Sequence, residues 1–162
     1  MNEFRLRPAT ADDVPLILDF IRQLAAYERL SHEVVATQAD LQRTLFGPRP
    51  AAEVVIGFID DEAAGFALFF HNYSTFLGQQ GIYLEDLFVA PTHRGKGLGK
   101  ALLVHLAGLA VERNCGRLEW SVLDWNEPAL EFYRSLEAVA MDEWTVHRVT
   151  GQTLEKLAAL DS

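Results

Sequence analysis

The sequence predicts an α/β fold, in which a mixed, mostly antiparallel and twisted sheet of about seven strands is flanked by helices on both faces. Three observations support this prediction. Strand and helix patterns follow one another in the order β-α-α-β-β-β-α-β-α-β-β. The chain has 162 residues, of which 49% are hydrophobic, enough to bury one core. No linker, internal repeat or low-complexity segment interrupts it, so we expect residues 1–162 to form a single domain.

The first half of the chain is expected to contain three strands and two helices. Val14, Ile17 and Leu18 begin an apolar pattern at helical spacing, and Thr10 and Asp13 before it have the form of a helix cap. A polar turn separates two apolar, β-prone segments and predicts a hairpin. The expected elements are a strand at 4–7, a helix at about 10–28, a short helix at about 37–46, and strands at 53–59 and 65–73.

The second half is organised around a strand, a glycine-rich turn and a helix. Pro91 ends the strand because proline has no N–H to give to a sheet. Within that strand Glu85 and Asp86 are successive, so their side chains are expected on opposite faces, with Asp86 in a structural role. The expected elements are a strand at 83–89, a helix beginning at about 100, a strand at 117–123, a helix opened by residues 126–128, strands at 139–141 and 144–149, and a terminal helical turn at 154–160.

The glycine-rich turn has the composition of an anion-binding loop. Gly95, Gly97 and Gly99 stand at alternate positions, and glycine allows both unusual backbone conformations and the close approach of a ligand. The free N–H groups at the start of the following helix, together with the helix dipole, favour an anion. Arg94 and Lys96 add positive charge. The turn therefore predicts a site for a diphosphate, with a turn that binds no ligand as the alternative.

Two well-known phosphate loops do not fit this turn. A P-loop would need a glycine at Arg94 and a serine or threonine at Ala101. A dinucleotide-binding fingerprint would need a third glycine one residue later, where Lys100 stands. What remains is Arg94-x-x-Gly97-x-Gly99, between a strand and a long helix.

That pattern and several other segments resemble one family. The segments are RPATA at 7–11, LAAYE at 24–28, YLED at 83–86, RGKGLG at 94–99, WNEP at 125–128 and FY at 132–133. Together they resemble the diamine (spermidine/spermine) N-acetyltransferase branch of the GNAT superfamily, which also includes thialysine acetyltransferases. The glycine loop is generic to the superfamily, whereas the other segments are more particular to this branch. The expected order of strands and helices is also that of the GNAT fold.

The resemblance implies an acetyl-CoA-dependent amine N-acetyltransferase that transfers the acetyl group directly. It implies that backbone groups of Leu87, Phe88 and Val89 bind the pantetheine arm and the thioester carbonyl. It further implies a CoA site in which Arg94, Gly95, Lys96, Gly97, Leu98, Gly99 and Lys100 hold the diphosphate and Asn126, Glu127, Pro128 and Ala129 line the channel. The residues implied to face the amine are Tyr27, Glu28, Glu85, Glu119, Trp120 and Ser121. Glu85 would act as the general base, directly or through water, and Tyr133 as the general acid.

The chemistry of the reaction favours the same two catalytic residues. An alkyl amine with a pKa of about 10 is mostly protonated at neutral pH, so it must lose a proton before it can attack a thioester. Glu85 lies on the central strand, where such a base is needed. A phenol such as that of Tyr133 can return a proton to the departing thiolate.

Ordinary structural roles are the alternatives for several of these residues. Tyr133 could be a buried aromatic beside Phe132, although the Asn-Glu-Pro segment before it favours catalysis. Glu28 could be a solvated helix end. Trp120 could belong to the core even though it is counted with the amine-facing residues, and the sequence leaves Trp125 and Trp144 open between core and amine pocket.

Composition restricts the partners and the compartment. The net charge of −9, without clustered Lys and Arg, argues against nucleic acid and mildly favours cationic ligands. No apolar segment approaches the ~20 residues of a membrane helix, and the N-terminus does not read as a signal peptide. Cys115 is the single cysteine, so we expect a cytoplasmic protein. The five histidines show no metal spacing, and no metal is expected.

We therefore expect an acetyltransferase acting on a polyamine, a diamine or a thialysine-like amino acid, as a homodimer. The alternatives are acetylation of protein lysines or N-termini, acetylation of an aminoglycoside, and an acyl-CoA sensor without catalysis. Two features depart from many relatives. Glu137 stands where they carry a glycine, so we expect another turn geometry there. The loop at 74–81 varies between relatives and leaves the amine undetermined.

Overall fold

The computed structural model describes residues 3–161, which divide between Leu123 and Asp124 into two units. The first unit contains a sheet of five strands in the order β1-β2-β3-β4-β5. Neighbouring strands are antiparallel except for β4 and β5, which are parallel, so the sheet is mixed and mostly antiparallel as predicted. The strands are β1 (Phe4–Pro8), β2 (Glu53–Ile59), β3 (Glu62–Ser74), β4 (Gln79–Val89) and β5 (Leu118–Trp120).

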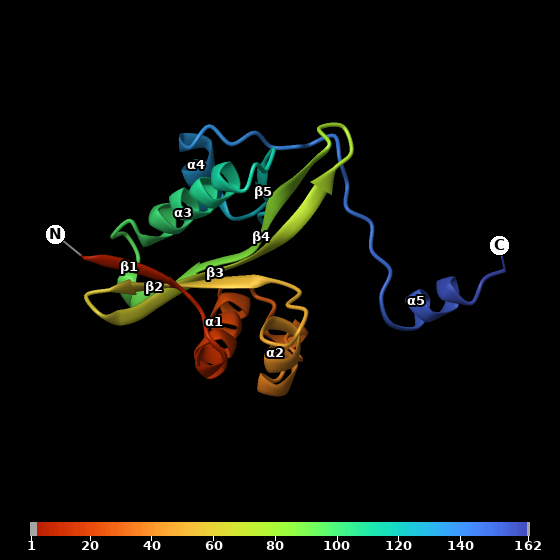
Figure 1. Ribbon diagram of the computed structural model, residues 1–162, viewed down its shortest axis with the longest axis horizontal. Helices are drawn as coiled ribbons and strands as arrows, with labels where there is room; N and C mark the ends of the chain where they lie inside the picture. The colour runs from red at the N-terminus through yellow and green to blue at the C-terminus, as the bar shows by residue number, and fades with distance from the viewer. Residues whose placement is uncertain (1–2, 162) are drawn as a thin grey trace. The chain divides into compact units, whose positions relative to one another are not determined.

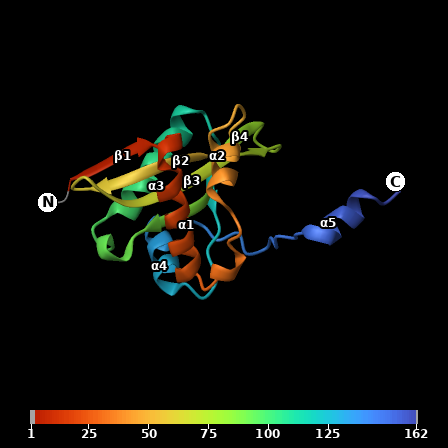
Figure 2. The ribbon, with the colours of Figure 1, turned by 90° about the horizontal axis from the view of Figure 1, so that it is seen from below.

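Helices cover both faces of this sheet (Figure 1). The helices α1 (Val14–Tyr27) and α2 (Gln38–Leu45) lie on one face, here called the α1 face, and α3 (Leu98–Glu112) lies on the other, the α3 face. In Figure 2, α1 runs across the strands. The ring of Phe20 from α1 stacks on Phe66 from β3 at 5.6 Å between centroids. Burial of such apolar surface on both faces provides the main driving force for folding.

Short polar segments determine how the strands are joined. The β2–β3 hairpin turns at Asp60 and Asp61, whose φ angles of 48° and 69° are both left-handed. A two-residue turn of this kind matches the twist of the strands that it joins, and aspartate tolerates it better than most residues. At the other end of β2, Arg7 of β1 donates two hydrogen bonds to Asp13, at 2.7 and 2.9 Å, and so fixes the start of α1.

The second unit contains two helices, α4 (Glu127–Ser135) and α5 (Gly151–Ala158). The strands expected at 139–141 and 144–149 are wrong, because the structure assigns no strand between residues 138 and 150. The strand expected at 117–123 is also shortened to β5. Apolar alternation is only a tendency, and a strand forms only where a neighbouring strand supplies hydrogen bonds. The sheet of described residues therefore has five strands instead of about seven.

The turn after α4 corrects a second expectation. Glu137 does not adopt a different geometry from glycine, since its φ angle is 64°, in the left-handed region. Its N–H donates to Arg134 O at 2.9 Å, and the N–H of Ala138 donates to Tyr133 O at 3.2 Å. These bonds close the helix in the way that a glycine usually does, with a side chain where it is unfavourable.

Candidate active site

The glycine-rich turn has the geometry of an anion site. Gly95 and Gly97 have φ angles of 76° and 95°, which L side chains rarely adopt. A Cβ atom added to Gly95 would meet nothing within 4 Å, so its backbone borders open space. Gly97 is the N-cap of α3 and supplies no capping side chain, so the first N–H groups of this 15-residue helix are not capped by one. The residues present therefore fit a diphosphate.

Strand β4 has an open edge immediately before this turn. It pairs with β3 as far as Val89, but with β5 only at residues 82–84. Residues 85–89 therefore have no partner strand on their β5 side in the sheet of described residues. The side chain of Phe88 is buried in the core, so its backbone is the part available to a ligand. An open strand edge is what the pantetheine prediction for Leu87, Phe88 and Val89 requires.

A β-bulge at Glu85 corrects the expectation for the two acids of β4. Leu68 pairs with Asp86 and the next residue, Phe69, pairs with Leu84, so Glu85 is one residue more than β3 can match. Phe69 points to the α3 face, where the guanidinium of Arg113 lies 6.0 Å from its ring. Leu68 packs against the core on the α1 face. The charge of Glu85 acts on both Asp86 and Glu28 at the end of α1, so the bulge places Glu85 on the α1 face together with Asp86.

Glu85, Asp86 and Glu28 at the end of α1 form an acidic cluster on this face. Burial, and then the charges of Glu85 and Glu28, raise the pKa of Asp86 to about 6. Burial, and then the charge of Glu85, raise the pKa of Glu28 above its usual value. The side chain of Asp86, for which a structural role was expected, makes no hydrogen bond within the described chain. Carboxylates that repel one another are favourable where a cationic amine binds among them.

Arg94 connects the turn to the end of α1. Its Nε donates to Val89 O at 2.9 Å, and its guanidinium lies 4.8 Å from the centroid of the Tyr27 ring and 5.8 Å from that of Phe88. The sequence predicted a direct role in diphosphate binding, and that role stays a prediction. In this structure Arg94 positions Tyr27 beside the end of β4 through a cation–π contact.

Residues of β5, and Ser121 directly after it, also contribute to the α1 face. Glu119 pairs with Tyr83, whose hydroxyl lies 2.7 Å from that of Ser121 and whose ring contacts Phe70 at 5.3 Å. Alternation places Glu119 and Ser121 on the α1 face and Trp120, paired with Leu84, on the α3 face. The predicted residues that the structure brings to the α1 face are Tyr27, Glu28, Glu85, Glu119 and Ser121, whereas Trp120 does not join them.

Three further residues of this face were not predicted, namely Asn72, Tyr83 and Arg117. Asn72 donates to Glu119 at 3.0 Å, and Arg117 lies 3.1 Å from the same carboxylate. Alternation along the strand expected at 117–123 would have placed Arg117 beside Glu119. Asn72 could not be placed from the sequence, because its face depends on the pairing of β3 with β4.

The remaining predicted residues lie on α4, in the second unit. Asn126 is the N-cap, and Glu127, Pro128 and Ala129 form the first turn. Tyr133 is half-buried, and its ring contacts Phe132 at 5.5 Å. This contact is the aromatic pairing that was considered as an alternative to catalysis. The roles of these five residues stay predictions.

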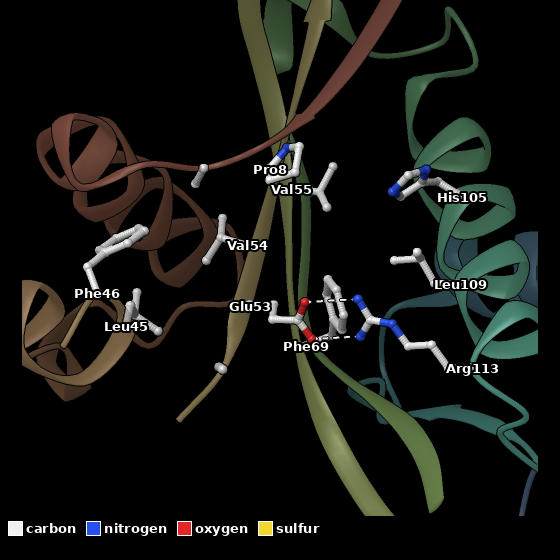
Figure 3. Close-up of a pocket in the computed structure, with 12 residues that line it drawn as sticks. Pro8, Leu45, Phe46, Glu53, Val54, Val55, Phe69, His105, Leu109 and Arg113 are labelled. Atoms are coloured by element: carbon white, nitrogen blue, oxygen red, sulfur yellow. Dashed lines mark hydrogen bonds and ion pairs between the residues drawn. The ribbon is translucent and has the colours of Figure 1, made fainter. Parts of the chain in front are cut away.

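A cleft of about 350 Å³ lies at the edge of the sheet where β1 leaves β2 (Figure 3). Arg113 donates to both carboxylate oxygens of Glu53, at 2.7 and 3.0 Å, and His105 and Phe69 also line the cleft. None of the predicted site residues lines it. Arg113 and Glu53 neutralise each other, so this ion pair offers no unpaired charge to a ligand.

No group of three or more His, Cys, Asp or Glu side chains within residues 3–161 could hold a metal ion. No helix in the described part of the chain is both long and apolar enough to cross a membrane.

Comparison with known proteins identifies the family. Residues 19–137 match the acetyltransferase (GNAT) family, so the chain belongs to it and is an acyl-CoA-dependent amine N-acetyltransferase. It is 36% identical to L-ornithine N5-acetyltransferase NATA1 of Arabidopsis thaliana, over 97% of this chain and 89% of that protein. It is 34% identical to thialysine N-epsilon-acetyltransferase of Caenorhabditis elegans, over 98% and 99%. The fold is similar to that of an integron cassette protein from V. cholerae, with a TM-score of 0.81, 27% identity, and coverage of 97% and 98%.

Proposed function

We propose that this protein transfers an acetyl group from acetyl-CoA directly to the primary amine of a small cationic acceptor, either a polyamine or diamine or a thialysine-like amino acid. The observation that carries the proposal is the acidic cluster of Glu28, Glu85 and Asp86 beside the open edge of β4. An ammonium group is attracted to such a cluster, and the open edge is adjacent to a loop that fits a diphosphate. The names of the relatives, which act on ornithine and thialysine, support a small amine.

Backbone groups position the donor in this proposal. Acetyl-CoA supplies the acetyl group as a thioester. The N–H groups of the turn and of the first turn of α3 hold its diphosphate. A backbone N–H of residues 87–89 donates to the carbonyl oxygen, on which negative charge develops. Residues 126–129 line the channel.

Two side chains move the protons. Glu85, which is exposed, accepts a proton from the ammonium group, directly or through water, and leaves a nucleophilic amine. The amine nitrogen bonds to the acetyl carbon and the carbon–sulfur bond breaks. Tyr133 gives its phenolic proton to the departing thiolate, and the second proton that the nitrogen loses restores the phenol, directly or through water. Holding the two substrates together supplies much of the remaining acceleration.

Free-thiol release from acetyl-CoA tests the proposal against spermidine, spermine, putrescine, ornithine, thialysine, lysine and an aminoglycoside. Glu85→Gln and Tyr133→Phe should each lower kcat by about 10²- to 10⁴-fold, the usual contribution of a positioned acid or base. Glu112→Gln is the matched control, since Glu112 is an exposed carboxylate at the end of α3.

The outcomes separate the alternatives. If acetyl-CoA binds but no small amine is acetylated, the proposal fails, and a protein substrate or an acyl-CoA sensor takes its place. If the aminoglycoside alone reacts, the acceptor class is wrong although the reaction is right.

A further inference from the structure

Asn72, Arg117 and Glu119 form a polar cluster on the α1 face, at the β5 side of the sheet. Nδ2 of Asn72 donates to Oε1 of Glu119 at 3.0 Å, and Nε of Arg117 lies 3.1 Å from the same oxygen. Asn72 lies on β3 and Glu119 on β5, two strands that do not pair with each other, and Arg117 directly precedes β5. They reach one another across Gly81 of β4, where an added Cβ atom would lie 2.5 Å from Oδ1 of Asn72.

The cluster has hydrogen-bonding capacity that the described residues do not use. Both contacts go to Oε1 of Glu119, so its Oε2 has no partner among them. The two terminal nitrogens of Arg117 likewise donate no hydrogen bond to another group in the described part of the chain, and the contact of this side chain with Glu119 is through Nε. Oδ1 of Asn72 is buried and accepts no hydrogen bond. Buried acceptors without a donor are uncommon, and a network that contains one is completed by a further donor.

The unused groups of Arg117 and Glu119, unlike the buried Oδ1 of Asn72, have opposite charges and are accessible. The side chains of Arg117 and Glu119 are 44% and 35% exposed. The free end of a guanidinium binds a carboxylate through two parallel hydrogen bonds. A free carboxylate oxygen binds an ammonium group. An amino acid offers both partners, because its α-ammonium and α-carboxylate are attached to the same carbon.

The distance from the cluster to Glu85 suits a diamino acid. Glu119 pairs with Tyr83, two residues before Glu85 on β4, and the bulge turns Glu85 to the same face. The cluster spans Gly81 to Tyr83, so it lies two to four residues before Glu85, which at ~3.3 Å per residue is about 7–13 Å along β4. A chain of four or five bonds spans about 5–6 Å, and a hydrogen bond of about 2.8 Å at each end brings its reach to about 11–12 Å.

We propose that Arg117 and Glu119, held by Asn72, bind the α-carboxylate and α-ammonium of a diamino carboxylic acid, whose terminal amine then lies at Glu85. The inference rests on the proposed amine acetylation and selects one of its two acceptor classes. A polyamine carries only positive charge, so Arg117 repels it and its guanidinium stays unused. A diamino acid satisfies both charges of the cluster.

Ornithine and putrescine provide the test, because putrescine is ornithine without its carboxylate. The wild-type protein should have the higher kcat/KM with ornithine. Arg117→Met should reduce the ratio of kcat/KM for ornithine to that for putrescine by about 10- to 100-fold, the value of charge-assisted paired hydrogen bonds. Arg117→Lys should recover part of the ratio. Arg22→Met, at an exposed position on α1, is the matched control and should leave the ratio unchanged.

Ornithine methyl ester tests the same contact without a variant, so a variant that fails to fold does not prevent a result. Loss of the carboxylate charge should lower kcat/KM in the wild-type protein by at least tenfold. Equal rates with ornithine and its ester, or a ratio that Arg117→Met leaves unchanged, would overturn the inference. If the wild-type protein acetylates putrescine or spermidine but neither ornithine nor lysine, the inference fails while the proposed function stands. If no amine is acetylated, the proposed function itself fails.

Discussion

Glu85 is one residue more than β3 can pair with, and this insertion determines the chemistry of the α1 face. Without the bulge, Glu85 and Asp86 would point to opposite faces, and only one of them would lie near Glu28. With it, Glu85 and Asp86 lie close together, and the charge of Glu85 disfavours the ionised form of Asp86. The exposed Glu85 is suited to exchange a proton, while the half-buried Asp86 is held beside it at a cost in stability.

The energetic cost of holding a charged Asp86 beside Glu85 predicts how stability depends on pH. The pKa of Asp86 rises to about 6 in the folded protein, mainly through burial. The folded state therefore binds more protons than the unfolded state between about pH 4 and pH 6, and the free energy of unfolding falls as pH rises through that window. Asp86→Asn removes the charge and should raise the free energy of unfolding at pH 7.5 by about 3 kcal/mol.

Urea unfolding at pH 5 and pH 7.5 measures the effect. The advantage of Asp86→Asn over the wild-type protein should be smaller at pH 5, where the aspartate of the folded protein is mostly protonated. Asp12→Asn, at an exposed position, is the control. An advantage that does not change with pH would show that packing, not charge, is responsible.

The turn between β4 and α3 is the element whose function follows most directly from its backbone. Gly95→Ala places a Cβ in open space but on a residue with a φ angle of 76°, which strains the loop. We expect the KM for acetyl-CoA to rise by about tenfold, while the KM for the amine changes little. Steady-state kinetics with each substrate varied in turn measure both.

Gly108→Ala, in the middle of α3, is the matched control. An added Cβ there also meets nothing within 4 Å, and Gly108 does not have a left-handed φ angle. It should leave both KM values unchanged and raise the free energy of unfolding by about 0.5–1 kcal/mol, because alanine favours a helix. A similar rise in the KM for acetyl-CoA in both variants would remove the loop from the proposed site.

At the end of α4 the opposite substitution, from a larger residue to glycine, is expected to stabilise the protein. Glu137 has a left-handed φ angle of 64°, which is unfavourable for a residue with a Cβ. Glu137→Gly should therefore raise the free energy of unfolding of α4 by about 0.5–1 kcal/mol. Amide hydrogen exchange in α4 measures the change, with Glu137→Ala as the control that keeps the strain. Equal protection in both variants would show that the strain is negligible.

The sequence was sufficient for those elements whose patterns are local. Pro91 marks the end of β4, the caps at Thr37 and Asp40 mark the start of α2, and the acidic turn marks the β2–β3 hairpin. It was insufficient where the outcome depends on a distant segment. The bulge depends on β3, and strands at 139–149 require a partner that no local pattern supplies. The resemblance counted Trp120 with Glu119 and Ser121 as facing the amine, whereas alternation along the strand separates Trp120 from them.

The charge of the whole chain agrees with the proposed acceptor. A net charge of −9 at neutral pH attracts cationic amines from a distance and is screened by salt. The acidic cluster and the cluster around Arg117 act at shorter range. Attraction therefore brings many amines to the α1 face, and the contact with Arg117 selects among them.

The homodimer is the last prediction, and the C-terminal segment is where it can be tested. Val139, Trp144 and Val146 are 81%, 77% and 82% exposed, and they belong to the β-prone segments that form no strand. Such side chains are usually covered in a stable assembly. We expect light scattering after size exclusion to give about twice the chain mass of 18.1 kDa.

Trp144→Glu should shift the protein toward the monomer, because a charge is unfavourable in an apolar interface. Phe76→Glu is the control, since Phe76 is 99% exposed in the β3–β4 turn, outside the segment in question. If both variants remain dimeric, the interface lies elsewhere. If the wild-type protein is monomeric at micromolar concentration, the dimer prediction is wrong, and residues 139–149 must be covered within one chain or remain in water.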